Sequence, residues 1–166
     1  MRYAQMRKYD ISNGPGVRAT LFVSGCTHKC EDCFNTSYQD FKYGKEWNEE
    51  AREQFMDYVM NERVVGVNIL GGEPLQQTMD NELATLLALI KEKTNKPIWV
   101  WTGYKLEDIA NNIKVQQILK SVDVLIDGRF EKDLKDLNLM YKGSANQRVI
   151  DLNYFKKNKI IKTIDI

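Results

Sequence analysis

Short apolar segments alternate with amphipathic segments along most of this 166-residue chain. The apolar segments are rich in β-branched and aromatic side chains and predict strands, at residues 17–23, 64–70, 97–101 and 122–126. The segments between them space their apolar side chains as a helix does, at residues 47–62, 83–90 and, in one or two pieces, 106–119. Such alternation is typical of an α/β fold with a mostly parallel sheet.

The length of the chain limits how such a sheet can close. A complete eight-unit barrel takes roughly 250 residues, so we expect an incomplete, open barrel formed by a single domain over residues 1–166. Residues 147–152 and 159–164 each fit a further strand, and residues 1–13 show no clear pattern.

Each predicted strand up to residue 126 ends in a glycine-rich or polar segment, which is where α/β folds place their sites. Gly71 and Gly72 would let a ligand approach the backbone, and Glu73 could pair with an ammonium group. Thr102 ends the next strand. Asp127 and Arg129 could reach one ligand together, or could form a surface ion pair of little energetic consequence. Each segment also fits an ordinary turn.

All three cysteines of the chain, Cys26, Cys30 and Cys33, follow the first predicted strand in a C-x3-C-x2-C spacing. Three thiolates can hold three irons of a [4Fe-4S] cluster and leave the fourth iron open to a substrate or cofactor. A structural zinc site with His28, the only histidine, is an alternative, as are unliganded thiols. The spacing favours the cluster, because His28 lies between two of the cysteines and would close a tetrahedral site awkwardly.

The composition argues against two classes of partner. The 24 basic residues nearly balance the 23 acidic ones, so a nucleic-acid role gains little support. No apolar run approaches a membrane span, and the N-terminus does not read as a signal peptide. We therefore expect a cytoplasmic protein, in which clustered cysteines more often bind metal than form disulfides.

Several motifs occur together and in order, at residues 13–18, 21–26, 30–35, 72–75, 98–104, 122–128 and 143–148. On these motifs the chain resembles the radical S-adenosylmethionine superfamily and, within it, the activating proteins of anaerobic ribonucleotide reductases. The superfamily often has an aromatic residue before the third cysteine, and here that residue is Asp32. The resemblance then implies that backbone from Asp32 through Cys33 to Phe34 contacts the adenine. The absence of further cysteines implies the minimal type with one cluster.

The resemblance also implies a cofactor site. Cys26, Cys30 and Cys33 would hold the cluster, and the amino and carboxylate groups of S-adenosylmethionine would chelate the open iron. The backbone of Gly71, Gly72 and Glu73 would receive the amino end of the methionine. Thr102 would lie on the same rim, and Asp127 and Arg129 would hold the ribose or the carboxylate.

The activity implied is reductive cleavage of S-adenosylmethionine to a 5′-deoxyadenosyl radical, which makes a glycyl radical on the large catalytic subunit of the reductase. A flavodoxin-like protein would supply the electron, and no acid–base residue is needed. Candidates for partner contacts are Arg18, Tyr104 and residues 146–148. The alternatives are a small radical enzyme that forms a deazapurine, and a non-enzymatic zinc or electron-transfer module.

Overall fold

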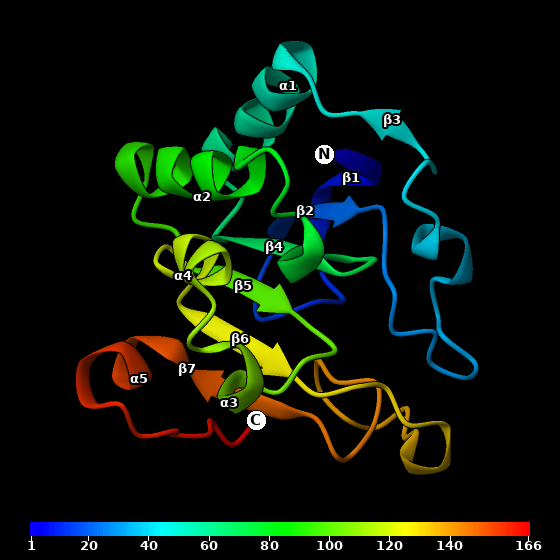
Figure 1. Ribbon diagram of the computed structural model, residues 1–166. Coiled ribbons are helices and arrows are strands. Elements are labelled where there is room, and N and C mark those ends of the chain that lie inside the picture. Colours follow the sequence, from blue (N-terminus) through cyan, green and yellow to red (C-terminus); the bar gives the residue numbers. More distant parts are fainter.

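The computed structural model describes all 166 residues, whose strands form one sheet with helices along one face and long loops on the other (Figure 1). The strands are β1 (Arg2–Asp10), β2 (Arg18–Val23), β3 (Lys45–Glu46), β4 (Gly66–Gly71), β5 (Ile98–Trp101), β6 (Val124–Asp127) and β7 (Arg148–Asp151). The α-helices are α1 (Glu49–Met60), α2 (Glu82–Lys93), α3 (Leu106–Ile109), α4 (Ile113–Leu119) and α5 (Leu152–Asn158). Short 3-10 turns are η1 (Thr36–Gln39), η2 (Pro74–Gln76) and η3 (Lys132–Leu134).

The strand order in the sheet is β3-β1-β2-β4-β5-β6-β7. Strands β2, β4, β5 and β6 run parallel, while β1, β3 and β7 are antiparallel to their neighbours. The predicted α/β class and the parallel centre of the sheet are confirmed. The edge strands β3 and β7 do not pair with each other, so the sheet is open, as a mixed sheet rather than a closed barrel.

Two expectations about the chain ends need correction. Residues 1–13, which show no clear pattern, contain the nine-residue strand β1. Charged and polar residues interrupt its apolar ones, and Arg7 and Tyr9 are exposed, so its sequence lacks the apolar run of a strand buried on both faces. Residues 159–164 do not form a strand, and contribute only a single bridge between Thr163 and Ile150.

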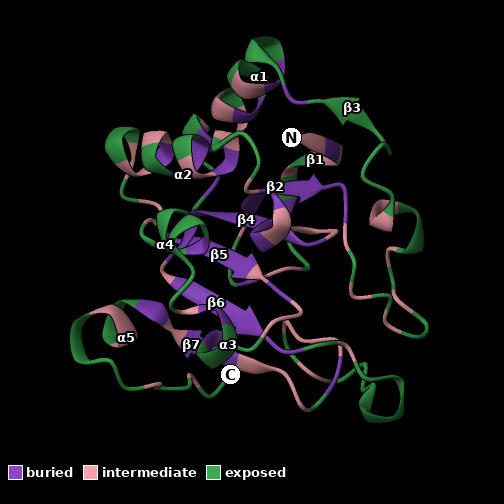
Figure 2. Cartoon of the chain, in the orientation of Figure 1, coloured by how far each residue is buried: buried purple, intermediate pink, exposed green.

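The main core lies between the sheet and the helices. It is a cluster of 27 buried apolar residues that includes Leu21 of β2, Ile69 of β4, Phe55 of α1 and Leu87 of α2. Side chains alternate along a strand, so the neighbours of these strand residues point to the opposite face. Figure 2 shows that the central strands are buried, whereas much of the loop region beyond their ends is half-buried or exposed. None of the helices combines the length and apolar character that a membrane span requires.

The opposite face of the sheet holds a buried polar layer centred on Arg18, which is only 1% exposed to solvent. Its Nε donates to Asn68 Oδ1 at 2.6 Å, and its Nη2 donates to the carbonyls of Val67 and Pro97 at 3.1 and 3.0 Å. Its guanidinium carbon lies 5.1 Å from the centre of the Trp99 ring. Burial lowers the pKa of Arg18 to about 10, which leaves it charged at neutral pH. Arg18 is therefore a buried structural cation, and the expectation that it contacts a partner is wrong.

Candidate functional site

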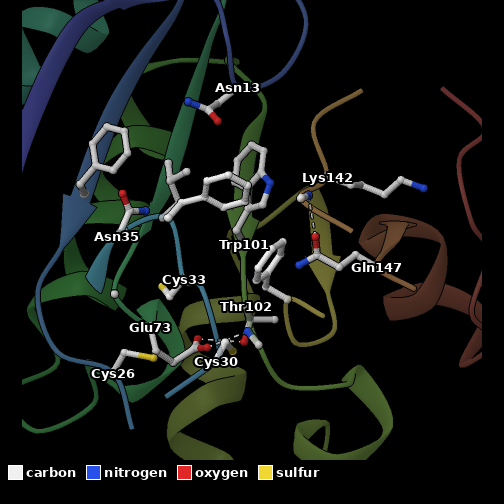
Figure 3. A pocket seen from close by; sticks show the side chains of 18 of the residues that line it. Asn13, Cys26, Cys30, Cys33, Asn35, Glu73, Trp101, Thr102, Lys142 and Gln147 are labelled. Atoms are coloured by element: carbon white, nitrogen blue, oxygen red, sulfur yellow. Dashed lines mark hydrogen bonds between the residues drawn. The ribbon is translucent and has the colours of Figure 1, made fainter. Parts of the chain in front are cut away.

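A cavity of about 420 Å³ opens where the parallel strands end (Figure 3). The loops after β2, β4, β5 and β6 all contribute to its wall. Among the residues predicted for a site, the wall includes Cys26, Cys30, Cys33, Phe34, Gly71, Gly72, Glu73 and Thr102. The fold thus brings together residues that lie up to 76 positions apart in sequence, from Cys26 to Thr102.

Aromatic and apolar side chains form another part of the wall. Phe22, Leu70 and Trp101 project from β2, β4 and β5, and Phe130 and Tyr141 come from the long loop before β7. The Trp101 indole N–H donates to the Tyr141 carbonyl at 2.8 Å, which fastens that loop to the sheet. Such a wall offers an apolar surface that excludes water from a reaction centre. Trp101 lies in one of the quoted motifs, at residues 98–104, but the sequence did not predict it as a residue of the site.

The three cysteines lie in a segment without helix or strand, and all three are free and half-buried. Lys29 and Asp32 have positive φ values of 52° and 53°, so the loop turns tightly between its cysteines. Burial raises the pKa of the Cys26 thiol to about 11, and burial also raises that of Cys30. Both thiols are therefore protonated at neutral pH in the absence of metal, and metal binding would release their protons.

The structure brings the cysteines to one cavity without gathering them into a ready set of metal ligands (Figure 3). Three free thiols on one short loop nevertheless supply the donor atoms that an iron–sulfur cluster uses. The three thiols fit an iron–sulfur cluster, and assembly of the cluster would bring the three cysteine side chains closer together.

Glu73 is the most constrained side chain of the site, with only 1% of the residue exposed. Its Oε1 accepts hydrogen bonds from the Leu75 N–H at 2.9 Å and the Thr102 hydroxyl at 2.8 Å. Its Oε2 accepts from the Gly103 N–H and pairs with His28 Nε2, both at 2.8 Å. Four partners saturate the carboxylate. The contacts do not support the interpretation that Glu73 pairs with a ligand's ammonium group.

His28 is held inside the protein by this pairing. Its side chain is 6% exposed, and its ring packs edge-on against Tyr104 with centroids 4.5 Å apart. A carboxylate only accepts hydrogen bonds, so the proton between the two residues lies on Nε2. The pairing with Glu73 occupies Nε2, which leaves Nδ1 as the one ring nitrogen with a lone pair that could bind a metal. Tyr104, a predicted partner contact, is here part of the packing around His28.

The two glycines of the rim serve close contacts between chain segments. Gly71 has a φ of 110°, which favours glycine. A Cβ on Gly72 would lie 2.6 Å from the Gly25 carbonyl oxygen and 2.9 Å from the Tyr38 carbonyl oxygen. The N–H groups of Gly72 and Glu73 donate to Val23 and Gly25, each at 2.8 Å. No protein donor bonds to the Gly72 carbonyl, so that oxygen is free to accept a hydrogen bond.

Three of the predicted residues do not line the cavity: Asp32, Asp127 and Arg129. Asp32 forms an exposed ion pair with Lys132 at 3.2 Å. The buried Asp127 accepts from the Leu106 N–H at 2.8 Å and from Arg148 Nε at 2.9 Å, so it ties α3 to β7. Asp127 pairs with Arg148 and not with Arg129, so the surface ion pair that the sequence left open as an alternative does not form.

The residue between Asp127 and Arg129, Gly128, does line the cavity, and its carbonyl accepts a hydrogen bond from Gln147 at 2.9 Å. Ser12, Asn13 and Asn35 also line the cavity, and they were not predicted from the sequence as site residues. Asn13 and Asn35 belong to quoted motifs, and this was the one signal that could have identified them.

Comparison with known proteins places these features in a family. A family model described as a 4Fe-4S single cluster domain matches residues 12–150, a span that contains every segment of the cavity wall except Arg7 of β1. The chain is 41% identical over 152 residues to the anaerobic ribonucleoside-triphosphate reductase-activating protein of Salmonella typhimurium, covering 90% of this chain and 97% of that protein. The chain belongs to the anaerobic ribonucleoside-triphosphate reductase-activating protein family.

Two further members of the activating-protein family show how wide the likeness is. The protein of the same name from Pasteurella multocida is 42% identical, covering 89% of this chain and 95% of that protein. The one from Enterobacteria phage T4 is 39% identical, covering 90% and 93%. The match runs nearly the full length in each case, so it includes the cysteine loop together with the strand-end rim.

Proposed function

We propose that this chain activates an anaerobic ribonucleotide reductase by reductive cleavage of S-adenosylmethionine, which generates a glycyl radical on the reductase. One observation carries the proposal above the others. Three free cysteines face the same cavity as the Gly72 rim, in a chain about 40% identical over about 90% of its length to proteins named for activating this reductase.

Cys26, Cys30 and Cys33 would be the ligands of the cluster. When bound, the cluster and S-adenosylmethionine supply a 5′-deoxyadenosyl radical that can take a hydrogen atom from a glycine. The chain itself provides three thiolates, an apolar wall at Phe22 and Trp101, and a cavity with an open mouth. These features position the reactants and exclude water.

The rim would hold S-adenosylmethionine mainly through backbone groups. The free Gly72 carbonyl is suited to accept from the amino group, since ammonium groups only donate. Backbone from Asp32 to Phe34 would contact the adenine. At the end of β6 the cavity is lined by Gly128 rather than by the side chains of Asp127 and Arg129, so a contact with ribose or carboxylate would run through this backbone.

We further propose that the open sheet is the incomplete β/α barrel of radical S-adenosylmethionine enzymes, formed by one domain over residues 1–166. The continuous seven-stranded sheet supports one domain. The cavity at the ends of the parallel strands supports the interpretation as an incomplete barrel, because an open barrel would let a partner protein reach its centre from the side of the loops. The large catalytic subunit of the reductase would be that partner, and a flavodoxin-like protein would supply the electron.

The decisive test combines iron content with radical formation. Anaerobic reconstitution should give a brown protein with about four irons per chain. With S-adenosylmethionine, a reductant and the reductase, electron paramagnetic resonance should show the doublet of a glycyl radical. Cys30→Ala should abolish S-adenosylmethionine cleavage. A colourless protein that holds zinc, or cleavage that survives the Cys30 change, would contradict the proposal.

A further inference from the structure

The half of the cysteine loop between Cys26 and Cys30 is fastened to the ends of two strands through a buried histidine. We propose that His28 is a positioning residue, which holds this half of the loop against the cavity rim through Glu73 and so fixes where Cys26 and Cys30 stand relative to that rim. The inference deepens the proposed function and rests on it.

The central contact joins loop and rim directly. His28 Nε2 lies 2.8 Å from Glu73 Oε2, between side chains that are 6% and 1% exposed. A hydrogen bond to a buried carboxylate is stronger than one between neutral groups. The other three bonds of Glu73 come from the rim itself, at Leu75, Thr102 and Gly103. His28 is therefore the only one of the four donors that belongs to the loop.

The rim is shaped to receive the histidine ring. A Cβ on Gly103 would lie 2.6 Å from Cδ2 and 2.7 Å from Nε2 of His28, so glycine leaves the space that the ring fills. Gly103 also donates its N–H to the same oxygen, Oε2 of Glu73, as His28 does. Tyr104 also packs edge-on against the His28 ring, with the two centroids 4.5 Å apart.

A second contact anchors the residue before His28. The Thr27 N–H donates to Gln76 Oε1 at 3.0 Å, and Gln76 Nε2 donates to the Thr27 hydroxyl at 2.7 Å and to the Tyr104 hydroxyl at 2.8 Å. Two consecutive loop residues are thus bound to the segments after β4 and β5. These contacts would therefore determine the position of a cluster bound by Cys26 and Cys30.

The second half of the loop is held differently and provides a matched control. Glu31 and Asp32 pair with Lys132 at 2.9 and 3.2 Å, and all three side chains are substantially exposed. Exposed ion pairs contribute little to stability. Loss of Lys132 should therefore leave the loop in place, whereas loss of the buried His28 donor should release it.

The first experiment uses the metal-free protein and measures amide hydrogen exchange over residues 26–33. His28→Phe keeps an aromatic ring at this position but loses the donor, and we expect exchange about tenfold faster, which corresponds to a loss of about 1.4 kcal/mol. His28→Gln, whose amide nitrogen can take the place of Nε2, should restore slow exchange, and Lys132→Ala should match the parent. Parent-like exchange in His28→Phe would overturn the inference.

The second experiment uses the reconstituted protein without the reductase. His28→Phe should keep the iron content of the parent, since all three cysteines remain, while kcat for S-adenosylmethionine cleavage falls about tenfold or more, because small misplacement of reacting groups is costly. KM should change less than about threefold, and His28→Gln should recover most of kcat. Unchanged kcat in His28→Phe, or the same loss of iron in His28→Phe and His28→Gln, would overturn the positioning role.

A variant that keeps His28 guards against a folding defect. Gly103→Ala places a methyl group against the ring, and we expect it to reproduce the fast exchange and low kcat of His28→Phe. Parent-like behaviour of Gly103→Ala would count against the inference. If the parent protein fails to cleave S-adenosylmethionine, the proposed function fails, while the exchange result still decides whether His28 anchors the loop.

Discussion

At the scale of single residues, one carboxylate joins three segments of the cavity wall. Glu73 follows β4 and accepts from Thr102 and Gly103, which follow β5, and from His28 in the loop after β2. A buried carboxylate is costly unless its oxygens are bonded, and here both oxygens are bonded twice. The order of the site therefore depends on this residue.

Glu73→Gln should destabilise the protein by about 2–3 kcal/mol, because its amide group would face N–H donors where an oxygen is required. Thr102→Val removes one donor and should cost about 1 kcal/mol. Urea unfolding of the metal-free protein under reducing, anaerobic conditions measures both. A smaller effect for Glu73→Gln than for Thr102→Val would refute this account.

Arg18→Met should lower the free energy of unfolding by about 1–3 kcal/mol, because the Asn68 amide oxygen and the Val67 carbonyl would each lose the charged donor. Met fills the space of the aliphatic stem but cannot donate. Chemical denaturation checks the value, with Arg63→Met, a substitution in an exposed residue, as the control that should change little. Equal stability of the two variants would show that the hydrogen bonds of the buried Arg18 guanidinium group do not contribute to stability.

At the scale of elements, the junction between β4 and the cysteine loop depends on backbone contact. A Cβ on Gly72 would lie 2.6 Å from the Gly25 carbonyl oxygen, and a Cβ on Gly25 would collide with the Phe41 ring, so both positions require glycine. The Gly72 and Glu73 N–H groups bond to Val23 and Gly25 across this junction. The base of the cysteine loop is thereby fixed to the end of the neighbouring strand.

Gly72→Ala should disturb this junction, since its Cβ would meet only backbone atoms that cannot move aside. We expect a loss of about 1–3 kcal/mol in stability, as for overpacking, together with lower iron content after reconstitution. Iron analysis and thermal unfolding measure the two effects. Retention of parent iron content and melting temperature would mean that the junction tolerates a methyl group.

Element prediction succeeded where a strand is buried on both faces and failed at an edge. Strands β4 and β5 read as apolar runs because helices cover one face and the polar layer and cavity wall cover the other. Strand β1 mixes charged, polar and apolar residues without a regular period, and it lies beside a two-residue edge strand. Its pairing with β2, and not its own sequence pattern, makes it a strand.

At the scale of the whole molecule, acid should loosen the side of the sheet that carries α3 and β7. Arg148 bonds to Glu107 of α3 and to Asp127 of β6, and the bond from Arg148 lowers the pKa of Glu107 from 4.5 to about 2. A depressed carboxyl pKa contributes stability that is present above 4.5 and is lost as the pH falls toward 2.

The free energy of unfolding should therefore fall between pH 5 and pH 2, with less than about 1 kcal/mol from Glu107, which is partly exposed. Glu107→Gln should flatten that part of the curve. Urea titrations at several pH values provide the measurement. A Glu107→Gln curve with the slope of the parent would exclude this contribution.

The sequence by itself determined the class of the fold, the cysteine loop and the strand ends that carry the cavity wall. These features are local, because the periodicity of apolar residues, the glycine turns and the cysteine spacing each depend on residues that lie close together in sequence. Only the tertiary structure decided which side chains face the cavity. Asp127 accepts a hydrogen bond from Arg148, the buried Glu73 accepts from four donors, and Arg18 is buried. Such choices depend on partners up to 79 residues away, as between Arg18 and Pro97, and no local pattern encodes them.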